Sequence, residues 1–253
     1  MPSVKDIAIV LRLLDWSETS QIAVLFTEHH GKVSATAKGA KRQTPSTLAK
    51  FSGGLELLGL GEAVFISKRP TELANLTEWD LVDAHWHLRR DLRGYRLAMY
   101  AADLVHHVVQ DHDAHPVTFA ALRQCLAELA DRAAQPAAML RFQWTVVEDM
   151  GLRPVLEHDA QTGEDLADMG ATVAFSHVAG GVVADTGSPD RWRVRRTTIE
   201  LLQQVAAGKP LNHASPEALD RANKLLCAYF RAILDRQLPT MDVILDRESD
   251  AKN

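Results

Sequence analysis

Gln21-Ile-Ala-Val-Leu-Phe-Thr27, Glu28-His-His-Gly31 and Lys32-Val-Ser-Ala-Thr-Ala-Lys38 are the consecutive segments that decide the fold of the N-terminal part. The first is rich in the β-branched, aliphatic and aromatic residues that favour strands. Gly31 supplies the positive φ that a tight hairpin turn needs. Apolar and polar residues alternate in the third segment, which is typical of a half-buried strand with a polar, basic outer face. These segments therefore predict a β-hairpin.

Further strands are predicted on both sides of this hairpin. Ile7–Leu14 precedes it, and Leu55–Ser67 and Leu73–Asp80 follow it, after a flexible connector at residues 39–54. Gly59 and Gly61 inside the fourth predicted strand indicate a bulge or a sharp bend. Five short strands with bend glycines in the first 80 residues are typical of a small closed barrel.

The periodicity changes to that of helices after Asp80. Amphipathic helices are predicted at the following ranges: Leu92–Gln110, Val117–Arg132, Ala137–Met150, Thr197–Ala207 and Ser215 to Gln237. Residues 152–192 lack this period and predict a turn-and-strand insert. The expected domains are therefore a barrel at 1–80 and a helical domain at 81–253, an α+β organisation.

The composition is that of a globular protein, with 253 residues and a net charge of −5. The basic residues are unevenly distributed: residues 1–77 carry a net charge of +2 and residues 78–253 one of −7. Cys125 and Cys227 lie in apolar helical stretches and are expected to be buried free thiols, as in a reducing compartment. No signal peptide or membrane-spanning run is recognised, and the phosphate-loop and nucleophile-elbow motifs of enzymes are absent.

The segment from His29 to Leu55 contains five basic residues and no acidic one, and it is the strongest indication of function. Cations on a strand face and on the adaptable loop that follows it suit contacts with phosphates, as in barrels that bind single strands. The candidate DNA contacts are Lys32, Lys38, Lys41, Arg42 and Lys50. The alternative is a solvated loop with scattered charges. Phe51 is the aromatic residue placed nearest this segment, whereas Phe26 and Phe65 are assigned to the core.

Two further basic clusters could extend a DNA path or pair with carboxylates. In Leu88-Arg-Arg-Asp-Leu-Arg-Gly-Tyr-Arg96 we expect pairing with carboxylates of the helical domain. Arg191-Trp-Arg-Val-Arg-Arg196 is left open, with Arg193 and Arg195 as candidate DNA contacts. A third cluster, of histidines at 106, 107, 112 and 115, lacks the spacing of a zinc motif.

Several motifs of the chain form a recognisable set: Ser17-Glu-Thr-Ser20, Val24-Leu-Phe-Thr27, Ala37-Lys-Gly-Ala-Lys-Arg42 and, near the end, Tyr229-Phe-Arg-Ala-Ile-Leu-Asp-Arg-Gln-Leu238. This set bears a close resemblance to the RecO family of recombination mediators. It implies an N-terminal OB fold followed by a helical domain. Lys38, Lys41 and Arg42 match the family's basic segment.

This resemblance also implies a function. A RecO protein binds single- and double-stranded DNA, anneals complementary strands, and helps to load RecA together with RecR, and in some members RecF, on DNA covered by single-strand-binding protein. We therefore expect a cytoplasmic, nucleoid-associated repair protein that is not an enzyme. The competing hypothesis is an adaptor whose barrel binds a peptide and not DNA.

The insert departs from the family pattern. Many RecO proteins carry a four-cysteine zinc motif there, whereas the corresponding positions here are Asp159, Thr162, Ala184 and Gly187. The glycines of the motif remain, so a zinc-ribbon-like turn geometry is expected without its metal. A remnant site from His158, Asp159, His177 and Asp185 is the alternative. The sequence thus predicts no metal and no cofactor.

Overall fold

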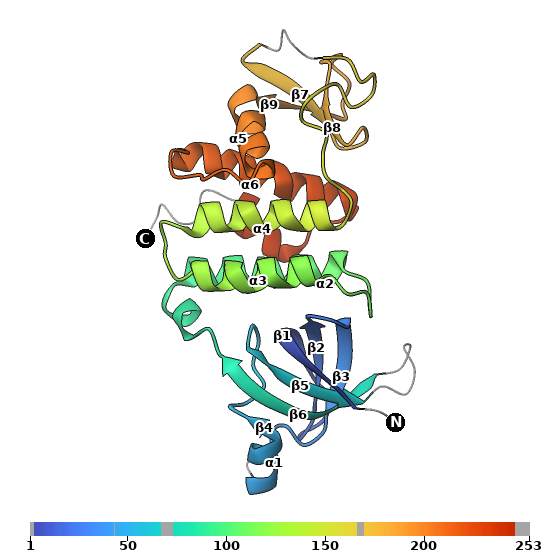
Figure 1. Ribbon diagram of the computed structural model, residues 1–253, viewed down its shortest axis with the longest axis vertical. Helices are drawn as coiled ribbons and strands as arrows, with labels where there is room; N and C mark the ends of the chain where they lie inside the picture. The colour runs from blue at the N-terminus through green and yellow to red at the C-terminus, as the bar shows by residue number, and fades with distance from the viewer. Residues whose placement is uncertain (1–2, 43, 67–72, 166–169, 246–253) are drawn as a thin grey trace. The chain divides into compact units, whose positions relative to one another are not determined.

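The predicted N-terminal strands form a closed barrel in the computed structural model, which describes residues 3–42, 44–66, 73–165 and 170–245 (Figure 1). The strands are β1 (Val4–Asp15), β2 (Gln21–Thr27), β3 (Gly31–Ala37), β5 (Leu60–Ile66) and β6 (Ala74–Asp83), with the two-residue β4 (Phe51–Ser52) at the edge. β1, β2, β5 and β6 pair with their neighbours in antiparallel fashion, and β3 pairs with β6 in parallel. This last pairing closes an OB-fold-like barrel of five strands.

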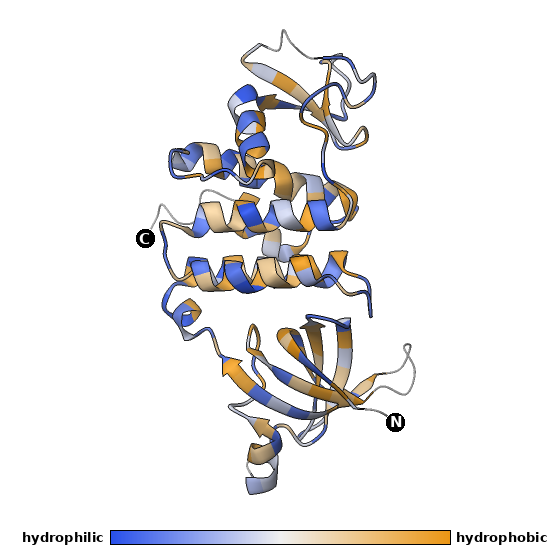
Figure 2. Cartoon of the chain, in the orientation of Figure 1, coloured by the Kyte–Doolittle hydropathy of each residue, from blue (hydrophilic) through white to orange (hydrophobic). Residues whose placement is uncertain are grey.

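The barrel interior is filled by small residues together with a few large rings. Alanines at inward positions of every long strand leave room for Phe65 and for the fully buried Trp79. Such alternation of small and large side chains fits the narrow interior of a five-stranded barrel. In Figure 2 the strands β1 and β2 are predominantly hydrophobic, as expected for strands that line a closed core.

Gly61 lies at the predicted bulge. The register between β5 and β6 shifts at Leu60/Gly61, and a Cβ on Gly61 would lie 2.5 Å from the ring of Trp79. Glycine is therefore required where the indole crosses the strand. The predicted start of this strand at Leu55 was wrong, because a turn closed by the N–H of Gly59 on the carbonyl of Glu56 (3.1 Å) occupies those residues.

The connector predicted as flexible contains regular structure. Helix α1 (Pro45–Lys50) begins at Thr44, whose hydroxyl accepts a hydrogen bond from the N–H of Thr47, and proline occupies the first turn. The helix leads directly into β4. The Thr-Pro pair is thus a helix start within a segment whose composition alone indicated a loop.

The first compact unit, Met1–Ala130, continues beyond the barrel into helices. After the 3-10 turn η1 (Trp86–Arg90) come α2 (Leu92–Val108) and α3 (Pro116–Glu128). α3 packs on the barrel through Phe119, whose ring centroid lies 5.7 Å from that of Phe26. The last barrel strand ends at Asp83, close to the domain limit predicted at residue 80, but the compact unit extends to Ala130.

The second compact unit, Asp131–Asn253, combines helices with the predicted insert. The helices are α4 (Gln135–Asp149), α5 (Arg196–Ala206), α6 (Pro216–Ile233) and α7 (Asp242–Leu245), with the 3-10 turn η2 (Pro239–Met241). α4 and α6 are joined by a buried hydrogen bond from Gln143 to Asn223 (2.7 Å). The insert forms a small sheet of β7 (Thr172–Ser176), β8 (Gly181–Val183) and β9 (Arg191–Arg195).

The helix predictions agree with these elements to within a few residues, and the largest differences are at the ends of α3, at Glu128 and not Arg132, and of α6, at Ile233 and not Gln237. Cys125 and Cys227 are buried free thiols, as predicted. None of the described helices is long and apolar enough to cross a membrane.

Candidate nucleic-acid interface

Two loops meet at one end of the β2–β3 hairpin. The β1–β2 loop covers residues 16–20, and the turn after β3 covers residues 38–42. The N–H of Lys41 donates to the carbonyl of Thr19 (3.1 Å), and the N–H of Gly39 donates to the hydroxyl of Ser20 (3.1 Å). These bonds hold the two loops side by side, and we call the surface that they form the loop surface.

The loop surface presents three of the predicted cations to solvent. Lys38, Lys41 and Arg42 are all exposed. They lie in a turn in which Gly39 adopts a φ of +75° and accepts a hydrogen bond from the N–H of Arg42 (2.8 Å). In the part of the chain that the structure describes, Lys38 and Arg42 have no ion-pair partner, so both charges are available to a polyanion.

Lys41 differs from its two neighbours, because its ammonium group pairs with the carboxylate of Asp15. The hydrogen bond from Lys41, together with its charge, holds the pKa of Asp15 below its usual range. Exposed pairs of this kind contribute little to stability. A phosphate can therefore replace the carboxylate at modest cost.

Trp16 adds an aromatic wall to the loop surface. A hollow of about 330 Å³ is lined by Trp16, Ser17, Thr19, Ser20, Thr36, Lys38, Gly39 and Arg42. The Trp16 side chain is 64% exposed, although burial of such a large aromatic ring would be favourable in free energy. An exposed ring beside cations suits a nucleobase stacked on the ring, with its phosphates on the cations. Sequence reasoning missed Trp16; the available signal was a tryptophan within a polar loop between two strands.

Lys50 and Phe51 have opposite surroundings. Lys50 is exposed at the end of α1, a helix with no buried residue. Phe51 was predicted as the aromatic nearest the basic segment, and this was wrong, because its ring is 4% exposed and belongs to the barrel core. Pairing of β4 with β6 at Trp79 draws the Phe51 side chain inward.

Lys32, which was predicted as a DNA contact, is not positioned to reach a phosphate. Its side chain is only 11% exposed, and its ammonium group donates to the carbonyls of His106 (2.6 Å) and Val109 (2.8 Å). Asp111 lies 3.3 Å from the same group. Lys32 is thus bonded to the end of α2 and has no free donor face for a phosphate. Alternation along β3 placed Lys32 and Lys38 on one face, but α2 covers only the first of them.

Arg193 and Arg195 lie on β9 in the second unit, whereas the other predicted cations belong to the first unit. Both are exposed, and Arg193 lies 3.3 Å from the carboxylate of Asp185. Their neighbour Trp192 stacks on Phe175, with centroids 5.9 Å apart. They form a separate basic strand face of the insert.

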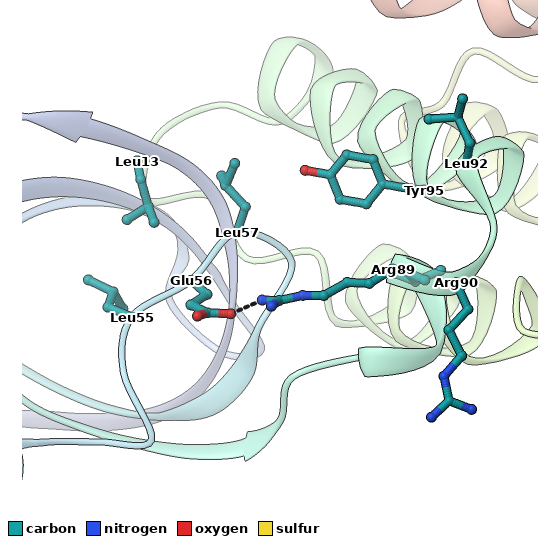
Figure 3. A pocket seen from close by; sticks show the side chains of 9 residues that line it. Leu13, Leu55, Glu56, Leu57, Arg89, Arg90, Leu92 and Tyr95 are labelled. Carbon is teal, nitrogen blue, oxygen red and sulfur yellow. Dashed lines mark hydrogen bonds and ion pairs between the residues drawn. The ribbon is translucent and has the colours of Figure 1, made fainter.

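The basic cluster at 88–96 lines a second hollow, of about 730 Å³, in the first unit (Figure 3). Its walls are largely apolar and consist of Leu13, Leu55, Leu57, Leu88, Leu92 and Tyr95, with Glu56, Arg89 and Arg90. Arg89 pairs with Glu56, and its guanidinium group lies 4.0 Å from the centre of the Trp86 ring. The carboxylate partner thus comes from a barrel loop and not from the helical domain as expected.

The clustered histidines and the insert residues have separate partners. His106 interacts with Arg12 (3.1 Å), His107 with Asp103 (3.4 Å) and His115 with Asp113 (3.3 Å). In the insert, the Asp159 carboxylate accepts hydrogen bonds from the N–H groups of Gln161 (2.7 Å), Thr162 (3.0 Å) and Ala184 (2.7 Å).

Comparison with known proteins identifies two family models that together cover most of the chain. The model described as "Recombination protein O N terminal" matches residues 1–85, and "Recombination protein O C terminal" matches residues 89–242. The "DNA repair protein RecO" of Anaeromyxobacter sp. (strain K) is 30% identical over 248 residues, 94% of each chain. That of Geobacter metallireducens is 30% identical over 254 residues, which covers 99% of this chain and 100% of the relative.

Proposed function

The chain belongs to the RecO family of DNA repair proteins, and on that premise we propose that it is a recombination mediator that binds single- and double-stranded DNA through the loop surface. The observation that carries this proposal is the grouping of Lys38 and Arg42, free of ion pairs among the described residues, around the exposed ring of Trp16. Lys41 adds a third cation to the loop surface, Lys50 on α1 is a further candidate contact, and Arg193 and Arg195 are candidates on β9.

The proposed mechanism requires no covalent chemistry. Cations that neutralise the phosphates of two strands lower their mutual repulsion, so complementary bases can pair. The protein would thereby anneal strands coated by single-strand-binding protein and load RecA with RecR, and with RecF where that protein is present. It would act in the cytoplasm, without enzymatic activity and without a metal in the insert.

The decisive experiment measures the salt dependence of binding to labelled oligonucleotides. Each phosphate neutralised contributes about 0.7 to the slope of log K against log salt for single strands. The double variant Lys38→Glu/Arg42→Glu should therefore lower the slope by at least about 1.4 and weaken binding to both kinds of DNA. Circular dichroism should show an unchanged fold, because both side chains are exposed.

The matched control is Arg132→Glu/Lys209→Glu, which makes the same change in net charge at exposed positions of the second unit. It should retain most of the affinity and slope. Equal losses in the two double variants would mean that net charge, and not the loop surface, governs binding. Unchanged binding by the Lys38/Arg42 variant at low salt would remove the loop surface from the proposal.

The second candidate function is an adaptor that binds a peptide, and the leucine-lined hollow of Figure 3 favours it. A wall of leucines and Tyr95 suits an apolar peptide side chain. The salt titration separates the two functions. For an adaptor, any residual binding to oligonucleotides would be weak and would depend little on salt. Annealing of oligonucleotides coated with single-strand-binding protein would then test the mediator function directly.

A further inference from the structure

The turn between β2 and β3 brings acidic and imidazole groups together at the end of the barrel away from the loop surface. Asp6 of β1 has a side chain that is 3% exposed, and the Nδ1 atoms of His29 and His30 lie 3.0 and 2.7 Å from its two carboxylate oxygens. Donor atoms of Asp6, Glu28 and His29 all lie within 4.8 Å of one another. We propose that Asp6, Glu28 and His29 bind a divalent transition-metal ion of the zinc class.

The donor set decides the class of ion. An imidazole nitrogen with two carboxylates is a ligand set of zinc and its neighbours, whereas calcium and magnesium prefer oxygen ligands alone. Tetrahedral zinc at about 2.0–2.1 Å from each donor separates the donors by about 3.3 Å. His29 Nδ1 and Asp6 Oδ1, 3.0 Å apart, share a proton, so binding of the ion widens this distance slightly and releases that proton to solvent. Three protein ligands leave a fourth position for water.

The surrounding bonds hold the Asp6 carboxylate and the backbone of the turn in place before any ion arrives. The N–H groups of Ile7 and His29 donate to the Asp6 carboxylate, each at 2.9 Å, and His30 holds its second oxygen. The N–H of Glu28 donates to the carbonyl of Ile7 (3.0 Å). His30 is a positioning residue here, and its ring is itself packed edge-on against Phe65. The Asp6 carboxylate is therefore already oriented, so only the side chains of Glu28 and His29 have to adjust when an ion binds.

The hairpin geometry that creates the cluster depends on Gly31. This residue has a φ of +67°, and a Cβ there would lie 2.2 Å from the carbonyl oxygen of Asp113. The turn is therefore fixed against the segment that follows α2. An ion bound at Asp6, Glu28 and His29 would fasten the hairpin turn to β1. The turn lies at the other end of β3 from Lys38, roughly 20 Å away along the strand at about 3.3 Å per residue. This site differs from the two considered in the sequence, the histidines at 106–115 and the insert.

Titration of protein that carries no histidine tag and has been stripped by a chelator tests the proposal. Zn²⁺ should bind with one-to-one stoichiometry by calorimetry and should raise the midpoint of thermal unfolding. Co²⁺ should give the visible absorption of a four-coordinate site. His29→Ala should abolish saturable binding, and the isosteric Glu28→Gln should weaken it at least tenfold, by analogy with the losses of about 10–100-fold seen for supporting groups.

The control is His213→Ala, which removes an exposed histidine of the second unit and should bind as the wild type does. His29 is 68% exposed, so its variant is expected to fold, and circular dichroism without metal checks this. No saturable Zn²⁺ binding, undiminished binding by His29→Ala, or Mg²⁺ that binds as tightly as Zn²⁺ would each overturn the site. None of these outcomes bears on DNA binding by the loop surface.

Discussion

The carboxylate of Asp159 joins the two halves of the insert, because its Oδ2 accepts a hydrogen bond from the backbone N–H of Ala184 at 2.7 Å. Its Oδ1 accepts from the N–H groups of Gln161 and Thr162 in its own turn. Asp159 and Ala184 are two of the positions that the family resemblance matches to the cysteines of its zinc motif. A buried carboxylate thus links, through backbone donors, the two segments that a metal ion would link through thiolates.

Replacement of Asp159 should loosen the insert. Asp159→Asn keeps one oxygen acceptor and turns an amide N–H₂ group toward a backbone N–H, so we expect a loss of about 2–3 kcal/mol of stability. Hydrogen exchange of the Ala184 amide should accelerate, whereas Asp185→Asn, at an exposed neighbouring carboxylate, should leave it unchanged. Acceleration on adding a chelator to the wild type would contradict the metal-free insert.

Acid should have the same effect as this replacement. Burial acts to raise the pKa of Asp159, but the three backbone N–H groups, aided by Arg191, lower this pKa below its usual value of 3.8. The fold thus favours the ionised form of Asp159. The contribution of this carboxylate to the free energy of unfolding is present in full at pH values above the pKa of the unfolded chain. Protection of the Ala184 amide should therefore persist at neutral pH and decline as the pH falls through 3.8 and below.

Lys32 should contribute to stability, whereas Lys38 should contribute to binding. Lys32→Met leaves the carbonyls of His106 and Val109 without their charged donor, and we expect a loss of about 2–3 kcal/mol in the free energy of unfolding. Lys38→Met should change stability by less than about 0.5 kcal/mol and should lower DNA affinity. Denaturant titration measures the free energy of unfolding of both variants, and DNA titration measures their affinity. A loss of affinity in Lys32→Met and a loss of stability in Lys38→Met would show instead that Lys32 faces the DNA.

His106 should make the first unit less stable in mild acid. Burial, followed by the positive charges of Lys32 and Arg12, lowers the pKa of His106 from 6.5 to about 4. As the pH falls, the unfolded chain is protonated at this histidine before the folded one is. The free energy of unfolding is therefore highest above pH 6.5 and decreases as the pH drops from 6.5 toward 4. His106→Gln should flatten this part of the stability curve. NMR titration of the ring gives the pKa directly, and a value near 6.5 would contradict the prediction.

Trp16 should distinguish single strands from duplex. Stacking of a base on an aromatic ring contributes about 1–3 kcal/mol, and only unpaired bases are free to stack. Trp16→Ala should therefore weaken binding to single-stranded DNA by this amount and binding to duplex much less. Trp86→Ala is the matched control, because Trp86 is 59% exposed and stacks with Arg89, and neither residue lines the hollow of the loop surface. Equal losses for both variants would argue against a specific stacking position.

The sequence alone determined the long strands and helices of the fold and the basic segment of the candidate site, whereas it missed α1 and β4 in the connector. The period of two in β3, the glycine of its hairpin and the helical period after residue 80 are properties of short segments, so the strands and helices could be predicted without tertiary information. Exposure of Lys38, Lys41, Arg42 and Lys50 followed from their place in a polar turn and connector.

Tertiary structure alone decided which of these side chains remain available. α2 covers Lys32, pairing with β6 draws Phe51 into the core, and Trp16 meets Lys38 at the loop surface. Each of these contacts joins residues that are far apart in the chain or in different loops. The same holds for Asp6 with His29 and for Asp159 with Ala184. Local periodicity fixes which face of a strand a side chain occupies, but long-range packing fixes what lies against that face.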